Sequence, residues 1–337
     1  MDSFTAALHS HHCTRSEFHA SAADMRWPAG TVLRSASGLA YARGSLGGSA
    51  APAQSAVVLT HALGYCKELW LPTLHHLSKL VRNRVEFLAL DFSGHGASRP
   101  APRNYDWNRC HVDEVAEVLR EESLPDNLIG VGHSMGGATL VALELRIPGT
   151  LSRVAAIEPP LFTRLTAGIG RAATAAGLNP IAAAARRRRR VWPDADAARE
   201  HIGRRLAADW DPAALDAYIA HALRPDADRG GVALACDPET EALAVSSPGE
   251  SVGSLTSGYS GLCAFTLVTC ERSRFSPLGP MVPNAPYYEH LIAPALGAAV
   301  QRLDGVSHLA PHEDPKAVAA LIAAEVHAAV TQIPLVS

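Results

Sequence analysis

The sequence predicts an α/β fold with a mostly parallel central sheet that helices cover on both faces. Short apolar runs alternate along the 337 residues with longer helix-like segments, as they do in βαβ units. The runs are continuously apolar, which is typical of strands buried on both faces of a parallel sheet. An Ala- and Arg-rich stretch without such runs, residues 161–247, interrupts the alternation. We therefore predict a core of residues 29–160 and 248–337, a helical cap inserted at 161–247, and a loose N-terminal leader over residues 1–28.

The overall composition limits the class of protein and its partners. The chain is 47% hydrophobic and 19% charged, as expected of a soluble globular protein that buries a large core. A formal net charge of -3 argues against nucleic acid as the main partner, because phosphate binding usually requires a basic surface. No apolar run is long enough to cross a bilayer, so no membrane span is expected.

Targeting signals and cysteine spacing favour the cytoplasm. The first 25 residues lack the compact apolar region of a secretory signal, and the C-terminal Leu-Val-Ser is not the peroxisomal Ser-Lys-Leu address. The six cysteines are scattered without a C-x-x-C pair, which favours free thiols in a reducing compartment over a disulfide scaffold or a zinc site. We expect a cytoplasmic protein without a bound metal.

The elements before residue 128 follow from turn residues, apolar runs and helical spacing. Ser37 and Gly38 fit the turn of an opening hairpin over residues 31–45. Apolar runs predict strands at residues 56–60 and 85–90, and helical patterns predict helices at 67–80 and 106–122. In the second of these helices the apolar positions form one face: Val112, Val115, Val118 and Leu119.

The elements after residue 128 continue the alternation. Further strands are predicted from residue 128 to the turn at 132–136 and at residues 154–157, 262–269 and 299–303, with helices at 287–296 and 315–330. The last helix has one apolar face, formed by Val318, Leu321, Ile322 and Val326. The resulting order of strands and helices is that of a parallel sheet with helical crossovers.

Residues 128–138 combine a strand, a sharp turn and a helix around Ser134. Gly-His-Ser-Met-Gly at residues 132–136 is a G-x-S-x-G nucleophile elbow, in which backbone strain lifts the serine hydroxyl toward a substrate. Side chains at Gly132 and Gly136 would collide with the neighbouring strand and helix. The helix that follows directs free N–H groups at a developing oxyanion, so the N–H of Met135 is the first candidate donor.

Loops at the carboxyl ends of other strands are expected at the same rim of the sheet. Residues 61–64 follow a central strand, and the N–H of Leu63 is the second candidate oxyanion donor. Glu158 follows the next strand after the serine, which brings a carboxylate to this rim. His308 lies after the last predicted strand and is the preferred base for Ser134, because a serine hydroxyl needs a base to become nucleophilic. The rival base, His312, stands beside Glu-Asp-Pro, a sequence that fits the cap of the terminal helix.

These motifs resemble the α/β-hydrolase superfamily with a helical cap. The resemblance covers about residues 55–330 and is carried by residues 61–64, 91–98, 132–136 and 305–308, in that order. It implies an α/β-hydrolase fold and a catalytic order of serine, acid and histidine, which Ser134 and His308 fit.

The acid departs from the usual family pattern. In many members an Asp follows the next-to-last strand, but the matching position here holds Ser273 or Arg274. Some dehalogenases and lactone hydrolases instead carry the acid after the strand that follows the nucleophile, and Glu158 fits that position. Glu158 is therefore the preferred acid, and Glu271 is the alternative.

The resemblance implies a serine hydrolase that cleaves a carboxylic ester, thioester or lactone through an acyl-enzyme intermediate, with no metal or organic cofactor. A dehalogenase is disfavoured, because the attacking residue of that class is a carboxylate and position 134 is Ser. The unusual acid position leaves two alternatives open: a non-catalytic ligand-binding or interaction protein on the same fold, and a C–C hydrolase or lyase.

A closer resemblance is to a subgroup of hydrolases linked to secondary-metabolite and acyl-CoA thioester chemistry. It is carried by Cys-Lys-Glu-Leu at residues 66–69, Ile-Glu-Pro at 157–159 and the arginine run, five consecutive arginines at residues 186–190. This resemblance implies a small-molecule acyl substrate that is bulky or CoA-linked. The arginine run either holds the phosphates of such a substrate or forms a solvated helix face.

Overall fold

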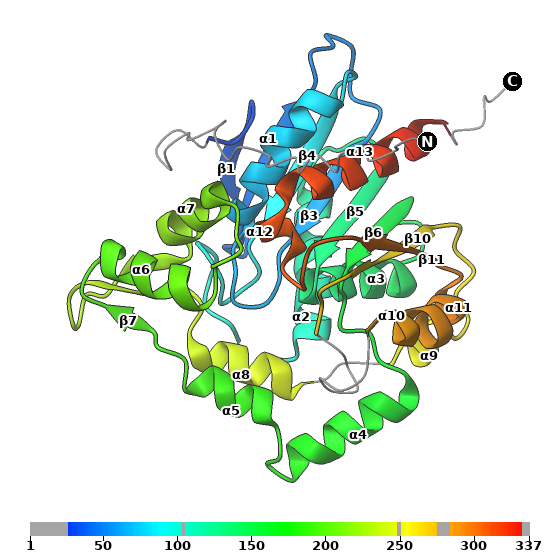
Figure 1. Ribbon diagram of the computed structural model, residues 1–337. Coiled ribbons are helices and arrows are strands. Elements are labelled where there is room, and N and C mark those ends of the chain that lie inside the picture. Colours follow the sequence, from blue (N-terminus) through cyan, green and yellow to red (C-terminus); the bar gives the residue numbers. More distant parts are fainter. Residues whose placement is uncertain (1–25, 103–104, 248–250, 275–283, 332–337) are drawn as a thin grey trace, which may run out of the picture.

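The central sheet has eight strands and is mostly parallel, as predicted (Figure 1). The computed structural model describes residues 26–102, 105–247, 251–274 and 284–331, so most of the predicted leader lies outside the described residues. The strands are β1 (Thr31–Arg34), β2 (Ala40–Leu46), β3 (Ala56–Thr60), β4 (Val85–Leu90), β5 (Leu128–His133), β6 (Arg153–Ile157), β10 (Ala264–Cys270) and β11 (Ala299–Leu303). Their order in the sheet is β1-β2-β4-β3-β5-β6-β10-β11, and only the β1–β2 and β2–β4 pairs are antiparallel.

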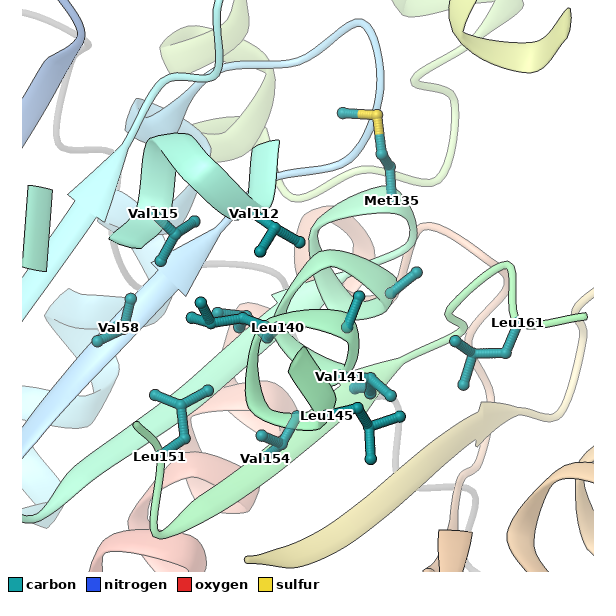
Figure 2. Packing of buried hydrophobic residues seen from close by; sticks show 14 of the residues in the cluster. Val58, Val112, Val115, Met135, Leu140, Val141, Leu145, Leu151, Val154 and Leu161 are labelled. Atoms are coloured by element: carbon teal, nitrogen blue, oxygen red, sulfur yellow. The ribbon is translucent and has the colours of Figure 1, made fainter. Parts of the chain in front are cut away.

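Helices cover both faces of this sheet, which confirms the predicted layering (Figure 1). One face carries α2 (Trp107–Glu121) and α3 (Met135–Arg146), and the other carries α1 (Leu71–Leu80) and α13 (Pro315–Thr331). Side chains of β3 alternate between the two cores, since Val58 packs under α2 and α3 whereas Val57 and Leu59 pack under α1 and α13. Figure 2 shows Leu140 of α3 amid Val58, Val112 and Val154. Burial on both faces explains why the strand runs are continuously apolar.

Most predicted elements lie within two residues of their expected bounds, and the largest differences are in two helices. Gly38 has a φ of 92°, which only glycine adopts readily, and it turns the chain between β1 and β2. The helix predicted at 67–80 begins with a 3₁₀ turn, Lys67–Trp70, before α1. The helix predicted at 287–296 is interrupted, because a π-helical turn, Tyr288–Ile292, separates α10 (Asn284–Tyr287) from α11 (Ala293–Leu296). Two short helices complete the core, α9 (Val252–Leu255) and α12 (Ala310–Glu313).

The chain from residue 164 to residue 246, between β6 and α9, forms a separate layer that contains helices and a small sheet. The helices are α4 (Arg164–Ala175), α5 (Pro180–Arg186), α6 (Ala195–Arg205), α7 (Pro212–His221) and α8 (Pro238–Ser246). The expectation of helices alone was wrong here, because β7 (Val191–Trp192), β9 (Val232–Leu234) and β8 (Leu223–Pro225) pair as an antiparallel sheet. This layer has its own apolar cluster, in which Trp192 and Tyr218 share contacts with Cys66 and Leu69 of the core. The insertion is thus anchored on the segment that follows β3.

Two further features of the described residues are the state of the cysteines and the lengths of the helices. The five cysteines within the described ranges, Cys66, Cys110, Cys236, Cys263 and Cys270, are all free thiols, as expected. Across the same ranges, every helix is too short or too polar to traverse a lipid bilayer.

Candidate active site

Ser134 stands at a strained turn between β5 and α3. Its φ of 52° and ψ of −120° lie in a region that side-chain-bearing residues rarely adopt, and its N–H donates a hydrogen bond of 2.7 Å to the carbonyl oxygen of Ile157. A Cβ atom on Gly132 would lie 2.5 Å from the carbonyl carbon of Gly136, and one on Gly136 would lie 2.5 Å from the carbonyl oxygen of Thr60. Both glycines are therefore required sterically, as the sequence predicts.

The two predicted oxyanion donors belong to segments that meet at this turn. Met135 is the first residue of α3, so its N–H has no acceptor within the helix. The close approach of Gly136 to the carbonyl oxygens of Thr60 and His61 brings the start of α3 against the loop that follows β3. Leu63 lies in that loop, within a turn closed by a hydrogen bond of 3.2 Å from the N–H of Tyr65 to the carbonyl oxygen of Ala62.

Glu158 directs its carboxylate at the imidazole of His308. The carboxylate is fully buried, and its Oε2 atom lies 3.4 Å from Nδ1 of His308. Oε1 accepts a hydrogen bond of 2.8 Å from the N–H of Cys270, and Oε2 accepts one of 2.5 Å from the hydroxyl of Ser273. Like Ser134, Glu158 has a positive φ, 50°. A carboxylate held from several sides can orient the ring and stabilise a positive charge on it.

Backbone pairing and one side chain bring these residues to the same rim. His133 and Ile157 are partners in the β5–β6 register, so Ser134 and Glu158 follow paired residues on adjacent strands. Nε2 of His133 lies 2.8 Å from the carbonyl oxygen of His308, and the two rings are 5.2 Å apart. A carbonyl only accepts hydrogen bonds, so Nε2 of His133 carries the proton and donates. Burial lowers the pKa of His133 well below its usual value, which keeps this ring neutral.

The alternative acid and the rival base have other partners. Glu271 is bonded to Arg302, at 2.5 Å, and accepts a hydrogen bond of 2.8 Å from the N–H of Gly305. The bond from Gly305, followed by the charge of Arg302, lowers the pKa of Glu271. His312 is buried between aromatic rings, 4.6 Å from the centroids of both Tyr65 and Trp210. Glu158 therefore faces His308, whose carbonyl oxygen is bonded to His133, the residue before Ser134, whereas Glu271 is bonded to Arg302 and Gly305. The ring of His312 lies 5.4 Å from that of His133.

Sequence reasoning missed a buried ionic network under the loop that follows β3. The N–H and Nζ of Lys67 donate hydrogen bonds of 2.7 and 2.8 Å to the two carboxylate oxygens of Asp91. Nε2 of His61 accepts a hydrogen bond of 3.2 Å from the N–H of Phe92, and its Nδ1 lies 2.7 Å from the carbonyl oxygen of Ala62. These contacts tie the loop after β3 to the loop after β4. Both loops carry motif residues in the sequence, but their mutual contact depends on the tertiary fold.

The arginine run is largely paired with acids from the start of α8. Arg186 bonds to Glu239, Arg188 to Glu241, and Arg190 to Asp237. Helix α5 ends at Arg186, so the expected solvated helix face does not describe the run. These acids neutralise charge that a bound phosphate would otherwise meet. No group of three or more His, Cys, Asp or Glu side chains in the described part of the chain is arranged to hold a metal ion.

Comparisons with known proteins agree with this architecture. A model of the alpha/beta hydrolase family matches residues 57–321. The structure is similar to the peroxisomal α/β-hydrolase Lpx1 of Saccharomyces cerevisiae, with a TM-score of 0.70, 18% identity, and 89% of this chain and 84% of that chain covered. It is also similar to the thioesterase domain from the curacin biosynthetic pathway, with a TM-score of 0.63, 19% identity, and 87% and 98% covered.

One curated relative matches over a shorter stretch. A segment of 100 residues is 32% identical to protein phosphatase methylesterase 1 of Schizosaccharomyces pombe, and the match spans 28% of this chain and 29% of that protein. The family match covers more than three quarters of the chain and includes the serine turn, the Glu158 strand and the loop of His308. The chain belongs to the α/β-hydrolase family.

Proposed function

We propose that the protein is a serine hydrolase that cleaves a carboxylic ester, thioester or lactone, with Ser134 as nucleophile, His308 as base and Glu158 as acid. The contact of 3.4 Å between Oε2 of Glu158 and Nδ1 of His308 carries this proposal, because it orients an imidazole beside the strained serine turn. The methylesterase and thioesterase named among similar proteins support the same class of bond.

The proposed reaction begins at the hydroxyl of Ser134. Nε2 of His308 accepts the hydroxyl proton while Oγ of Ser134 bonds to the carbonyl carbon, and Glu158 stabilises the imidazolium that forms. The N–H groups of Met135 and Leu63 hold the oxyanion. When the C–O or C–S bond of the leaving group breaks, His308 returns the proton to the departing alcohol or thiol.

The second half of the reaction releases the acid. His308 removes a proton from water as the water oxygen bonds to the acyl carbon, and the ester bond to Ser134 then breaks. Ser134 recovers the proton and the product is a carboxylic acid. No metal or organic cofactor is required by these steps.

Covalent labelling tests the nucleophile. A fluorophosphonate probe is expected to label the wild-type protein and not Ser134→Ala, because only an activated serine attacks the phosphorus atom. Absence of labelling in the wild-type protein overturns the proposal and favours the ligand-binding alternative. If product analysis shows that a C–C bond is cleaved and esters are not, the result favours the other alternative, a C–C hydrolase or lyase.

A substrate panel tests the acid and the substrate class together. The panel contains short and long p-nitrophenyl esters, lactones and acyl-CoA thioesters, which covers small, bulky and CoA-linked acyl groups. Glu158→Gln is expected to lower kcat by about 100-fold or more, since a neutral amide cannot stabilise the imidazolium. Glu271→Gln serves as the matched control and is expected to stay within about twofold of wild type, because surface substitutions usually have small effects. Equal activity of both variants contradicts the assignment of Glu158.

A further inference from the structure

Arg188, the third residue of the arginine run, is less exposed than Arg190 and has two side-chain partners. Nη1 of Arg188 lies 2.6 Å from Oε1 of Glu241, and Nη2 donates a hydrogen bond of 2.8 Å to the hydroxyl of Tyr218. The Arg188 and Glu241 side chains are 28% and 11% exposed, whereas those of Arg190 and Asp237 are 47% and 40% exposed. Arg188 therefore connects α7 and α8 from inside the inserted layer, while the neighbouring pair lies at the surface.

This ion pair packs directly against the loop that carries Leu63. A Cβ atom on Gly64 would lie 2.9 Å from Oε1 of Glu241 and 3.3 Å from Nη1 of Arg188, so the pair contacts the main chain of Gly64. Gly64 has a φ of 83°, a conformation that favours glycine. The next residue, Tyr65, packs edge-on against Tyr218, with ring centroids 5.7 Å apart. The loop is thus fixed by the inserted layer at two consecutive residues.

We propose that the Arg188–Glu241 pair is a positioning device that holds the turn at residues 62–65, and with it the N–H of Leu63, in the geometry that binds the oxyanion. This inference rests on the proposed function and extends it, because it makes the inserted layer a support of the oxyanion hole. Oxyanion donors act only when they are fixed before the reaction, and a shift of about 1 Å can cost about 100-fold in rate.

The charges of the pair matter as well as its packing. Burial raises the pKa of Glu241, and the charge of Arg188 opposes that rise. Without Arg188, the carboxylate of Glu241 beside the loop loses its charged partner, so its pKa rises further and the contact that holds it in place is lost. Arg188→Met is therefore more disruptive than Glu241→Gln, which removes the negative charge and keeps the side-chain volume. A lysine at position 188 keeps the charge but cannot reach both Glu241 and Tyr218 with one planar fork.

The test compares Arg188→Met, Arg188→Lys and Glu241→Gln with the matched control Arg190→Met, which removes an exposed arginine of the same run. Active sites are counted by fluorophosphonate titration, and kcat, KM and Ki for an alkyl trifluoromethyl ketone are measured per active site. The ketone forms a hemiketal with an activated serine, and its oxyanion occupies the same hole as that of the substrate.

Arg188→Met is expected to lower kcat by about 10- to 100-fold with little change in KM, and to weaken the ketone by the same factor. Arg188→Lys is expected to fall between Arg188→Met and wild type, and Arg190→Met within about twofold of wild type. The inference is overturned if Arg188→Met and Arg190→Met have equal kcat and Ki per active site, or if only the number of active sites falls. Should Arg188→Met not fold, Arg188→Lys and Glu241→Gln answer the same question. Failure of the wild-type protein to react with the probe contradicts the proposed function instead.

Discussion

Ser273 donates a hydrogen bond of 2.5 Å to Oε2 of Glu158, the same oxygen that lies 3.4 Å from Nδ1 of His308. Ser273 follows β10, and many α/β-hydrolases carry the catalytic acid in this stretch. A hydroxyl at this position cannot stabilise an imidazolium, but it can orient the carboxylate that we propose does so from the neighbouring strand. The two residues follow the adjacent strands β10 and β6 and meet at the carboxylate that faces His308.

Ser273→Ala tests whether this hydroxyl orients the acid. The variant is expected to lower kcat by about tenfold, because a hydrogen bond to a charged group contributes roughly 1.5–3 kcal/mol. The measurement is kcat at saturating ester, with KM as the internal control. An unchanged kcat contradicts the orienting role.

A complementary experiment moves the acid back to the usual position. Adding Ser273→Asp to Glu158→Gln is expected to restore part of the lost kcat, since the new carboxylate starts from a site already in contact with residue 158. The control is Ser273→Asp alone, in which the new carboxylate lies beside the buried one of Glu158, so the two repel each other and kcat falls. If the double variant is no more active than Glu158→Gln, the two positions are not interchangeable.

The core could be predicted from the sequence because its signals are local. Residues 56–60 and 85–90 form β3 and β4 with the predicted bounds, since each is an apolar run between turn residues. Residues 191 and 192 form β7, but a strand of two residues has no period to detect. The elbow is also local, and for this reason Ser134 could be identified without any tertiary information.

Pairings between distant segments could not be predicted in the same way. The sequence displays five adjacent arginines, yet the acid that neutralises Arg188 lies 53 residues further along the chain. From the sequence, Ser273 is only a residue unsuited to be the acid, whereas its bond to Glu158 joins residues 115 positions apart. Such contacts depend on how the insertion and the strand ends pack together in the tertiary structure, which the composition does not predict.

Because the ring of His312 is buried, we expect the protein to lose stability in acid. Burial lowers the pKa of His312 to about 3, from a usual value of 6.5. Between these values the unfolded chain binds a proton that the folded chain does not. Stability is therefore fully present above pH 6.5 and declines as the pH falls toward 3.

His312→Phe keeps an aromatic ring against Tyr65 and Trp210 and removes the titration. In urea unfolding at pH 7.5, 6 and 5, the free energy of unfolding of the variant is expected to decline less steeply than that of wild type. The difference in slope is about 1 kcal/mol per pH unit below 6.5. Burial also lowers the pKa values of four other histidines, which maintain the remaining slope: His61, His95, His111 and His133. If the free energy of unfolding declines equally with pH in the two proteins, the titration of His312 does not contribute to the decline.

The Lys67–Asp91 pair is expected to be a large single contribution to stability. Both side chains are buried, and although burial alone would raise the pKa of Asp91, the charge of Lys67 lowers it. Lys67→Met leaves the carboxylate buried without its partner, which is expected to cost about 3–5 kcal/mol in the free energy of unfolding. Adding Asp91→Asn should recover part of that cost in a double-mutant cycle. A cost below about 1 kcal/mol for Lys67→Met would contradict a role for the ion pair in holding the two loops.

Gly136→Ala tests whether the approach of α3 to the loop after β3 sets up the oxyanion donors. The added Cβ atom would lie 2.5 Å from the carbonyl oxygen of Thr60 and 2.7 Å from that of His61, and neither backbone atom can rotate away. The helix start must shift, so the proposed oxyanion donors, the N–H groups of Met135 and Leu63, are displaced relative to each other. We expect a loss of about 1–3 kcal/mol in stability and a fall of about 100-fold in the rate of fluorophosphonate labelling. Gly168→Ala in α4 is the control, since its Cβ atom meets nothing within 4 Å and alanine favours a helix. If both variants label at the wild-type rate, the separation between α3 and the loop after β3 does not govern the site.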